Sequence, residues 1–185
     1  MEKYVLIDRN GVINVRMDEP IKSPDEFVFC PSSIEAIFAL TRADIRSIVL
    51  TNEEALVHGG MDFSALDAIH AKMHSMIEEA GGRIHDVLVC PENNRDRFDG
   101  WYPNPGLLQK AAKKHGFNLR DTYFIGARYE CLEAAWAAGC KSAFVRSGKP
   151  YKTLQILRTS ERQPDLNEPD LMGAALKIVR LYQTR

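Results

Sequence analysis

The sequence has no long hydrophobic segment, no excess of charge of one sign and no closely spaced pair of cysteines. No apolar run approaches the roughly 18 residues of a membrane span, and the first predicted strand begins almost at the first residue. We therefore expect no membrane association, no signal peptide and a cytoplasmic location. The 24 basic and 25 acidic residues are mixed along the chain, whereas a nucleic-acid-binding protein usually carries a clustered basic patch.

The four cysteines are far apart in a chain of 185 residues, which is long enough to fold without cross-links. Free thiols are therefore expected. This length fits one domain, residues 1–185, able to bury about two thirds of its unfolded surface.

Short apolar runs alternate with segments of helical periodicity along most of the chain. Strands are predicted at 4–8, 47–52, 86–90, 122–126 and 142–145, and helices at about 33–41, 61–81, 107–115, 131–138 and 171–182. A serine cap at Ser32 or Ser33 is expected to start the first helix. The segment 151–158 can form a short helix, and 160–169 is expected to be a polar connector. Such alternation predicts an α/β fold with a doubly wound parallel sheet.

Polar residues end the first two predicted strands. Asp8 follows an apolar run and precedes Gly11, while Thr51 and Asn52 end the second run. Because ligands of open α/β sheets bind beyond the carboxyl ends of the strands, these side chains mark the expected site. Thr51 and Asn52 could instead satisfy backbone groups there, and both interpretations stay open.

Five stretches, taken in order, carry a family resemblance. They are Leu6-Ile7-Asp8-Arg9-Asn10-Gly11-Val12-Ile13-Asn14, Val49-Leu50-Thr51-Asn52, Pro103-Asn104-Pro105-Gly106, Phe124-Ile125-Gly126 running into Glu130, and Val145-Arg146-Ser147-Gly148-Lys149-Pro150. Together they resemble the haloacid dehalogenase (HAD) superfamily, in its capless branch of heptose bisphosphate and histidinol-phosphate phosphatases. The resemblance spans residues 3–150, leaving 151–185 as a C-terminal connector and helix. It implies a Rossmann-like fold with helices on both faces of the sheet and no large cap domain.

The resemblance also assigns roles to individual positions. Asp8 takes the position of the nucleophile that attacks phosphorus, and Thr51 and Asn52 take those that contact the phosphoryl oxygens. Asn10 stands where the family has its general acid, and an amide cannot supply that proton. Tyr102 stands where a lysine is expected, so a fixed positive charge is lost.

The metal positions depart from the family pattern as well. Ala127 and Cys131 replace the two acids that hold Mg²⁺, and neither offers the oxygen ligand that this ion prefers. The zinc loop of the branch falls between Cys90 and Tyr102, where only Cys90 is a matching ligand. We therefore expect no cofactor and no metal, with Mg²⁺ involved only if residual activity remains.

Arg128 follows the replaced metal position directly. Its guanidinium could pair with Asp8 where Mg²⁺ would lie, or it could be a solvated loop arginine. The lysines and histidine at 110–115 are expected to form a solvated helix face. No histidine has a place in the motifs, so Cys131 is not expected to be a nucleophile.

Two functions remain. The replaced residues favour an inactive or strongly impaired pseudophosphatase that acts by binding a phosphorylated small molecule or a protein partner. The alternative is a residual phosphatase that hydrolyses a phosphorylated sugar or small metabolite through Asp8.

Overall fold

A six-stranded parallel sheet forms the centre of the molecule. The computed structural model describes residues 2–57, 59–90 and 100–184, and the strand order is β3-β2-β1-β4-β5-β6. The strands are β1 (Lys3–Asp8), β2 (Ile45–Asn52), β3 (Ile84–Cys90), β4 (Tyr123–Gly126), β5 (Lys141–Val145) and β6 (Leu166–Glu168). The predicted parallel α/β sheet is confirmed.

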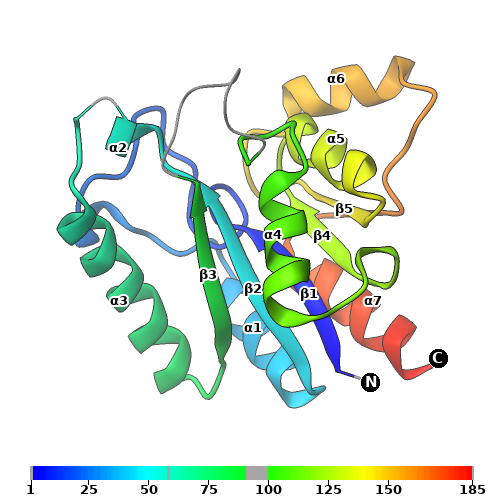
Figure 1. Cartoon of the computed structure of the whole chain (residues 1–185), viewed down its shortest axis with the longest axis horizontal. Helices are drawn as coiled ribbons and strands as arrows, with labels where there is room; N and C mark the ends of the chain where they lie inside the picture. The colour runs from blue at the N-terminus through cyan, green and yellow to red at the C-terminus, as the bar shows by residue number, and fades with distance from the viewer. Residues whose placement is uncertain (1, 58, 91–99, 185) are drawn as a thin grey trace.

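Helices cover both faces of this sheet (Figure 1). One face packs against α1 (Ser33–Arg42), α3 (Phe63–Glu79) and α7 (Leu171–Gln183), and the other against α4 (Gly106–His115) and α5 (Tyr129–Ala138). The remaining elements are α2 (Glu54–Val57), α6 (Tyr151–Thr159) and two short 3-10 helices, Pro24–Glu26 and Leu119–Asp121. This arrangement leaves the carboxyl edge of the sheet to loops.

Strand β1 is central because its side chains reach both halves of the core. Val5 and Ile7 enter the core beneath α1 and α7, whereas Tyr4 and Leu6 enter the core beneath α4 and α5. Ile7 pairs with strands on both sides, and Asp8 pairs with β2 only. The chain therefore leaves the sheet at Asp8, which pairs with Leu50, two residues before the end of β2.

Two details of the sequence prediction are wrong. The connector expected at 160–169 contains β6, which extends the sheet beside β5. Neither serine caps α1 through its side chain, because Ser32 has a φ of 60° and the Ser33 hydroxyl lies 2.9 Å from the carbonyl oxygen of Ile13. Ser33 thus ties α1 to the loop that follows β1.

The last helix packs against the molecule as the periodicity predicts. α7 lies beside α1, and the Tyr182 hydroxyl donates to the carbonyl oxygen of Tyr4 at 2.9 Å. All four cysteines are buried free thiols. Among the described residues, none of the helices has the length and apolar character needed to cross a bilayer.

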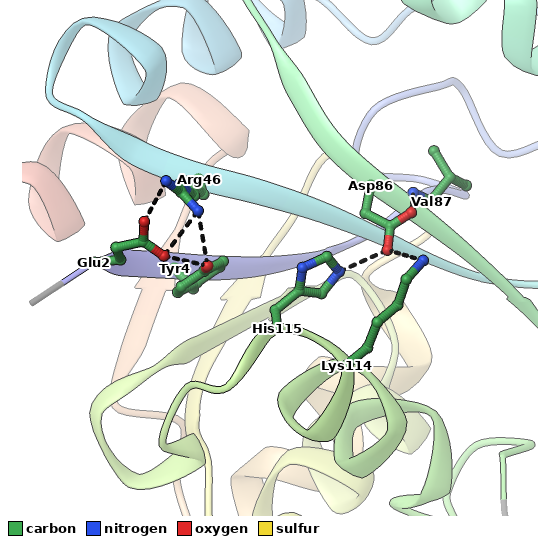
Figure 2. Close-up of polar contacts among 7 residues, drawn as sticks. All are labelled: Glu2, Tyr4, Arg46, Asp86, Val87, Lys114 and His115. Atoms are coloured by element: carbon green, nitrogen blue, oxygen red, sulfur yellow. Dashed lines mark hydrogen bonds and ion pairs between the residues drawn. The ribbon is translucent and has the colours of Figure 1, made fainter.

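The amino edge of the sheet carries a polar network (Figure 2). Lys114 Nζ and His115 Nε2 of α4 each lie 2.6 Å from Asp86 Oδ2 on β3, and Arg46 contacts both Glu2 and Tyr4. The basic run at the end of α4 is therefore only partly a solvated face. Two of its members attach the helix to the sheet.

This contact generates a pH-dependent prediction. Burial raises the pKa of Asp86, but hydrogen bonds from Lys114 and His115 outweigh it and leave the pKa below its ordinary value of 3.8. The carboxylate therefore contributes stability above that value, which is lost as the pH falls through the lower folded pKa. We expect Asp86→Asn to lower the free energy of unfolding by about 1 kcal/mol at pH 7 and by less at pH 3.

Urea unfolding at the two pH values measures this difference. Asp67→Asn on the exposed side of α3 is the matched control and should change little at either pH. An equal loss for Asp86→Asn at pH 7 and pH 3 would contradict the ionic role of this carboxylate.

Candidate functional site at the carboxyl edge of the sheet

Asp8 lies buried at the end of β1, with 1% of its surface exposed. Its Oδ2 atom is 3.8 Å from Arg128 Nη2 and 3.5 Å from Cys131 Sγ, which donates to it. Arg128 occupies the position directly before α5, without capping the helix through its side chain, and Cys131 lies in the first turn of that helix. Of the two interpretations of Arg128, the structure selects the one that pairs it with Asp8.

Burial controls the ionisation of this group of residues. It raises the pKa of Asp8, and the Arg128 guanidinium opposes the rise. Burial and the Asp8 charge both raise the pKa of the Cys131 thiol, which stays protonated and serves as a donor. This thiol is thus a partner of Asp8 and not a nucleophile.

Tyr102 closes the site from the side of α4. Its buried ring lies 5.5 Å from the Phe124 ring, and the Arg128 guanidinium is 5.9 Å from the Tyr102 ring centroid. Among the described residues, the Tyr102 hydroxyl and Arg128 Nε are buried with no hydrogen-bond partner. A phenol and a guanidinium therefore meet beside Asp8, where the family pattern has a lysine.

Asn10 lies two residues beyond Asp8 in the tight turn. Its Oδ1 atom accepts a hydrogen bond from Asn14 Nδ2 at 3.2 Å. The side chain has no ionisable proton, so it positions the turn without serving as an acid.

The end of β2 makes a second, separate network. The Thr51 hydroxyl donates to Glu53 Oε1 at 2.7 Å, and the same oxygen lies 2.7 Å from Arg9 Nη1. Arg9 Nη1 also contacts His70 Nε2 at 3.0 Å, and burial with the Arg9 charge lowers the pKa of His70 to about 3. His70 is therefore neutral and accepts from Arg9. The Thr51 hydroxyl hydrogen is directed to Glu53 instead of the cleft.

Asn52, the other residue at the end of β2, lies at the cleft. Its Nδ2 atom lies 3.4 Å from the Gly100 carbonyl oxygen, whereas Oδ1 is buried without a hydrogen-bond partner among the described residues. It is the residue of the second motif that lines the cleft directly.

A cleft of about 150 Å³ opens over this edge of the sheet. Asn10, Asn52, Glu53 and Arg128 lie along it, and the segment 16–21 forms the facing wall. Lys149 forms an ion pair with Asp18 on that wall. The lining thus mixes both signs of charge and admits only a small group.

The donor atoms at this site do not fit a magnesium ion. Ala127 presents a methyl group, Cys131 a protonated thiol, and the Arg128 cation already lies beside the Asp8 carboxylate. Within the ranges that the structure describes, no three acidic, histidine or cysteine side chains gather as a metal-binding group. Most of the expected zinc loop, residues 91–99, lies outside those ranges.

The loops at the end of the sheet approach very closely around Ala127. A methyl group added at Gly148 would lie 3.1 Å from the Ala127 methyl carbon, and one added at Gly11 would lie 3.4 Å from it. Ala127 itself is 1% exposed. A side chain at Gly148 would therefore crowd the Ala127 methyl group.

Sequence reasoning did not predict the contacts among Arg9, Glu53 and His70. Arg9 and Glu53 follow the last residues of two adjacent parallel strands and have opposite charges, and this signal could have indicated the pair. His70 could not have been found in this way, because only the packing of α3 brings it to Arg9.

The buried pair gives a stability prediction. Removing one partner of a buried ion pair leaves an uncompensated charge, so Glu53→Ala should lower the free energy of unfolding by about 3–5 kcal/mol. Glu53→Gln keeps acceptors for Thr51 and Arg9 and should cost less. Urea unfolding at pH 7 measures both, with Glu35→Ala on the exposed face of α1 as the control. A loss for Glu53→Ala no larger than that of the control would show that the pair is not needed.

Comparisons with known proteins agree on the family. A family model described as HAD-hydrolase-like matches residues 102–174. A D-glycero-beta-D-manno-heptose-1,7-bisphosphate 7-phosphatase from Pseudomonas aeruginosa is 37% identical over 81% of this chain and 84% of its own length. The enzyme of the same name from Bordetella bronchiseptica is 36% identical over 82% of this chain and 85% of its own length.

A solved structure extends the likeness to the whole fold. The D,D-heptose 1,7-bisphosphate phosphatase from B. bronchiseptica, crystallised with magnesium and phosphate, superposes with a TM-score of 0.90 at 32% identity. The match covers 99% of each chain. The resemblance seen in the sequence motifs, and the Rossmann-like fold it implied, are confirmed.

Proposed function

Because this chain belongs to the haloacid dehalogenase superfamily, in the family of the heptose bisphosphate phosphatases, we propose that it is a slow phosphatase of a phosphorylated sugar. The reaction proceeds through Asp8 at the carboxyl edge of the sheet. The names of the relatives favour a phosphatase over the inactive binding protein that the replaced motif residues led us to expect.

The contact between Asp8 and Arg128 is the observation that carries this proposal. A bare carboxylate repels a phosphate dianion, and the repulsion between unit charges about 4 Å apart is roughly 1 kcal/mol even in water. The guanidinium 3.8 Å from Asp8 Oδ2 compensates that charge and also lines the cleft. The guanidinium thus lies between the Asp8 carboxylate and the cleft that a phosphoryl group can enter.

The chemistry requires two steps. An Asp8 carboxylate oxygen forms a bond to phosphorus while the bond from phosphorus to the sugar oxygen breaks, which gives an aspartyl phosphate. The leaving oxygen takes its proton from water, because the Asn10 amide has none to give. Water then cleaves the aspartyl phosphate, releases inorganic phosphate and restores Asp8.

Slow turnover follows from the groups that have been replaced. A positioned general acid contributes typically 10²–10⁴-fold to rate, and this contribution is missing at Asn10. Burial also raises the pKa of Asp8, so the nucleophilic carboxylate is fully formed only above that raised value. Activity through Asp8 should therefore fall as the pH is lowered.

Binding without turnover is the second candidate. It is favoured by the non-acidic residues Ala127 and Cys131 and by the Thr51 hydroxyl, which donates to Glu53. In that case a phosphorylated small molecule or a protein partner would be bound and not consumed. For either function we propose a single domain of residues 1–185 acting in the cytoplasm, without nucleic acid as a partner.

Phosphate release from D-glycero-β-D-manno-heptose 1,7-bisphosphate tests the proposal. We expect slow release by the natural chain that is abolished in Asp8→Asn, because an amide is not a nucleophile toward phosphorus. Asp67→Asn, on the exposed side of α3, should keep the natural rate.

Two results would contradict the phosphatase. Release that persists in Asp8→Asn would mean that the reaction does not pass through this carboxylate. Absence of release from the natural chain would leave binding without turnover as the function.

A further inference from the structure

Arg128 lies between the nucleophile and the cleft. It comes directly after Ala127 at the start of α5, and its guanidinium is 3.8 Å from Asp8 Oδ2. Its side chain is 27% exposed, in contrast to 2% for the Asp8 side chain. The cation thus contacts the carboxylate and also reaches the space that a ligand would enter.

The surroundings fix this cation in place. The Tyr102 ring lies 5.9 Å from the guanidinium, within the range of a cation–π contact. Burial lowers the pKa of Arg128, but the acidic groups around it, the Asp8 carboxylate among them, outweigh burial and raise the value overall. Arg128 therefore stays charged at every pH at which the fold survives.

Two donors beside Asp8 lack an acceptor among the described residues. These are Arg128 Nε and the hydroxyl of Tyr102, which is 4% exposed. A buried donor without a partner is costly, and such groups in a native site call for an explanation. An oxyanion is the ligand that supplies several acceptors to an arginine and a phenol at once.

The same surroundings oppose a divalent metal. Ala127 and the protonated Cys131 thiol supply no hard oxygen ligand. A divalent ion bound to Asp8 would also lie close to the guanidinium. Two positive charges held against the same carboxylate repel each other strongly in a buried site.

We infer that this site binds a phosphoryl oxyanion without a divalent metal, with Arg128 as the cation that bridges Asp8 and the anion. The inference rests on the proposed phosphoryl site and specifies how its charge is compensated. A planar guanidinium can offer two parallel hydrogen bonds to a phosphate, which an ammonium cannot reproduce.

Titration calorimetry with inorganic phosphate tests this site, with EDTA in one series and excess Mg²⁺ in the other. We expect the same dissociation constant in both series. Arg128→Gln should weaken phosphate binding at least tenfold, and Arg128→Lys should restore part of the loss. Arg158→Gln, an exposed arginine on α6, makes the same change in net charge and should leave binding unchanged.

Asp8→Asn distinguishes Arg128 from a metal more sharply, because the two cations predict opposite changes in phosphate affinity. With Arg128 as the cation, removing the carboxylate removes a repulsion and should tighten phosphate binding about five- to tenfold. If a metal held by Asp8 bridged to the phosphate, the same substitution would weaken binding.

Several outcomes would overturn the inference: phosphate binding that requires Mg²⁺, binding that is weakened by Asp8→Asn, or no binding in either series. Urea unfolding of each variant shows whether a loss of phosphate binding reflects the site or the fold, and Arg128→Lys keeps the charge if Arg128→Gln does not fold.

Failure of the proposed phosphatase function can be told apart from failure of this inference. Metal-independent phosphate binding without phosphate release would refute hydrolysis and support the metal-free site. Mg²⁺-dependent release through Asp8 would support hydrolysis and refute the metal-free site.

Discussion

The ion pair between Asp8 and Arg128 determines what the carboxyl edge of this sheet can do. Asp8 is carried there by β1, whose side chains are buried on both faces, so its position is fixed by the whole core. Arg128 is fixed independently by β4 and the start of α5. A carboxylate buried in this way would be destabilised without a cation, and the guanidinium supplies one from within the chain. The guanidinium therefore compensates part of the buried charge before any ligand enters, while burial still leaves the pKa of Asp8 raised.

Much of the architecture could be predicted from the sequence because hydrophobic periodicity reports burial directly. The apolar run before Asp8 forms a buried strand, and the amphipathic segments that form α3 and α7 are helical where this was expected. Strand β6 was missed because its sequence, Leu-Asn-Glu, has little hydrophobic character and its pairing depends on β5. The predicted serine cap was wrong because the Ser33 hydroxyl contacts the carbonyl oxygen of Ile13 in a distant loop, a contact that local sequence does not encode.

The candidate site was predictable to a smaller degree. The motif positions placed Asp8, Asn52 and Arg128 at one edge, and the fold brings them there. The orientation of Thr51 could not be predicted, because it depends on the Glu53 carboxylate two residues later and on Arg9 beyond the neighbouring strand. Charge networks of this kind depend on three-dimensional proximity, which motif matching ignores. The expectation of an inactive protein was drawn from single motif residues. It gave too little weight to the likeness of the whole chain to phosphatases.

The close approach of the loops around Ala127 limits how this site can change. Ala127 is buried, and a side chain at Gly11 or Gly148 would lie within 3.4 Å of its methyl carbon, so an aspartate at this position would place a second negative charge in a closely packed part of the site. A single substitution toward the metal-binding pattern would therefore cost stability before it provided a ligand. The packing around Ala127 thus favours the present arrangement, in which Arg128 and not a second carboxylate accompanies Asp8.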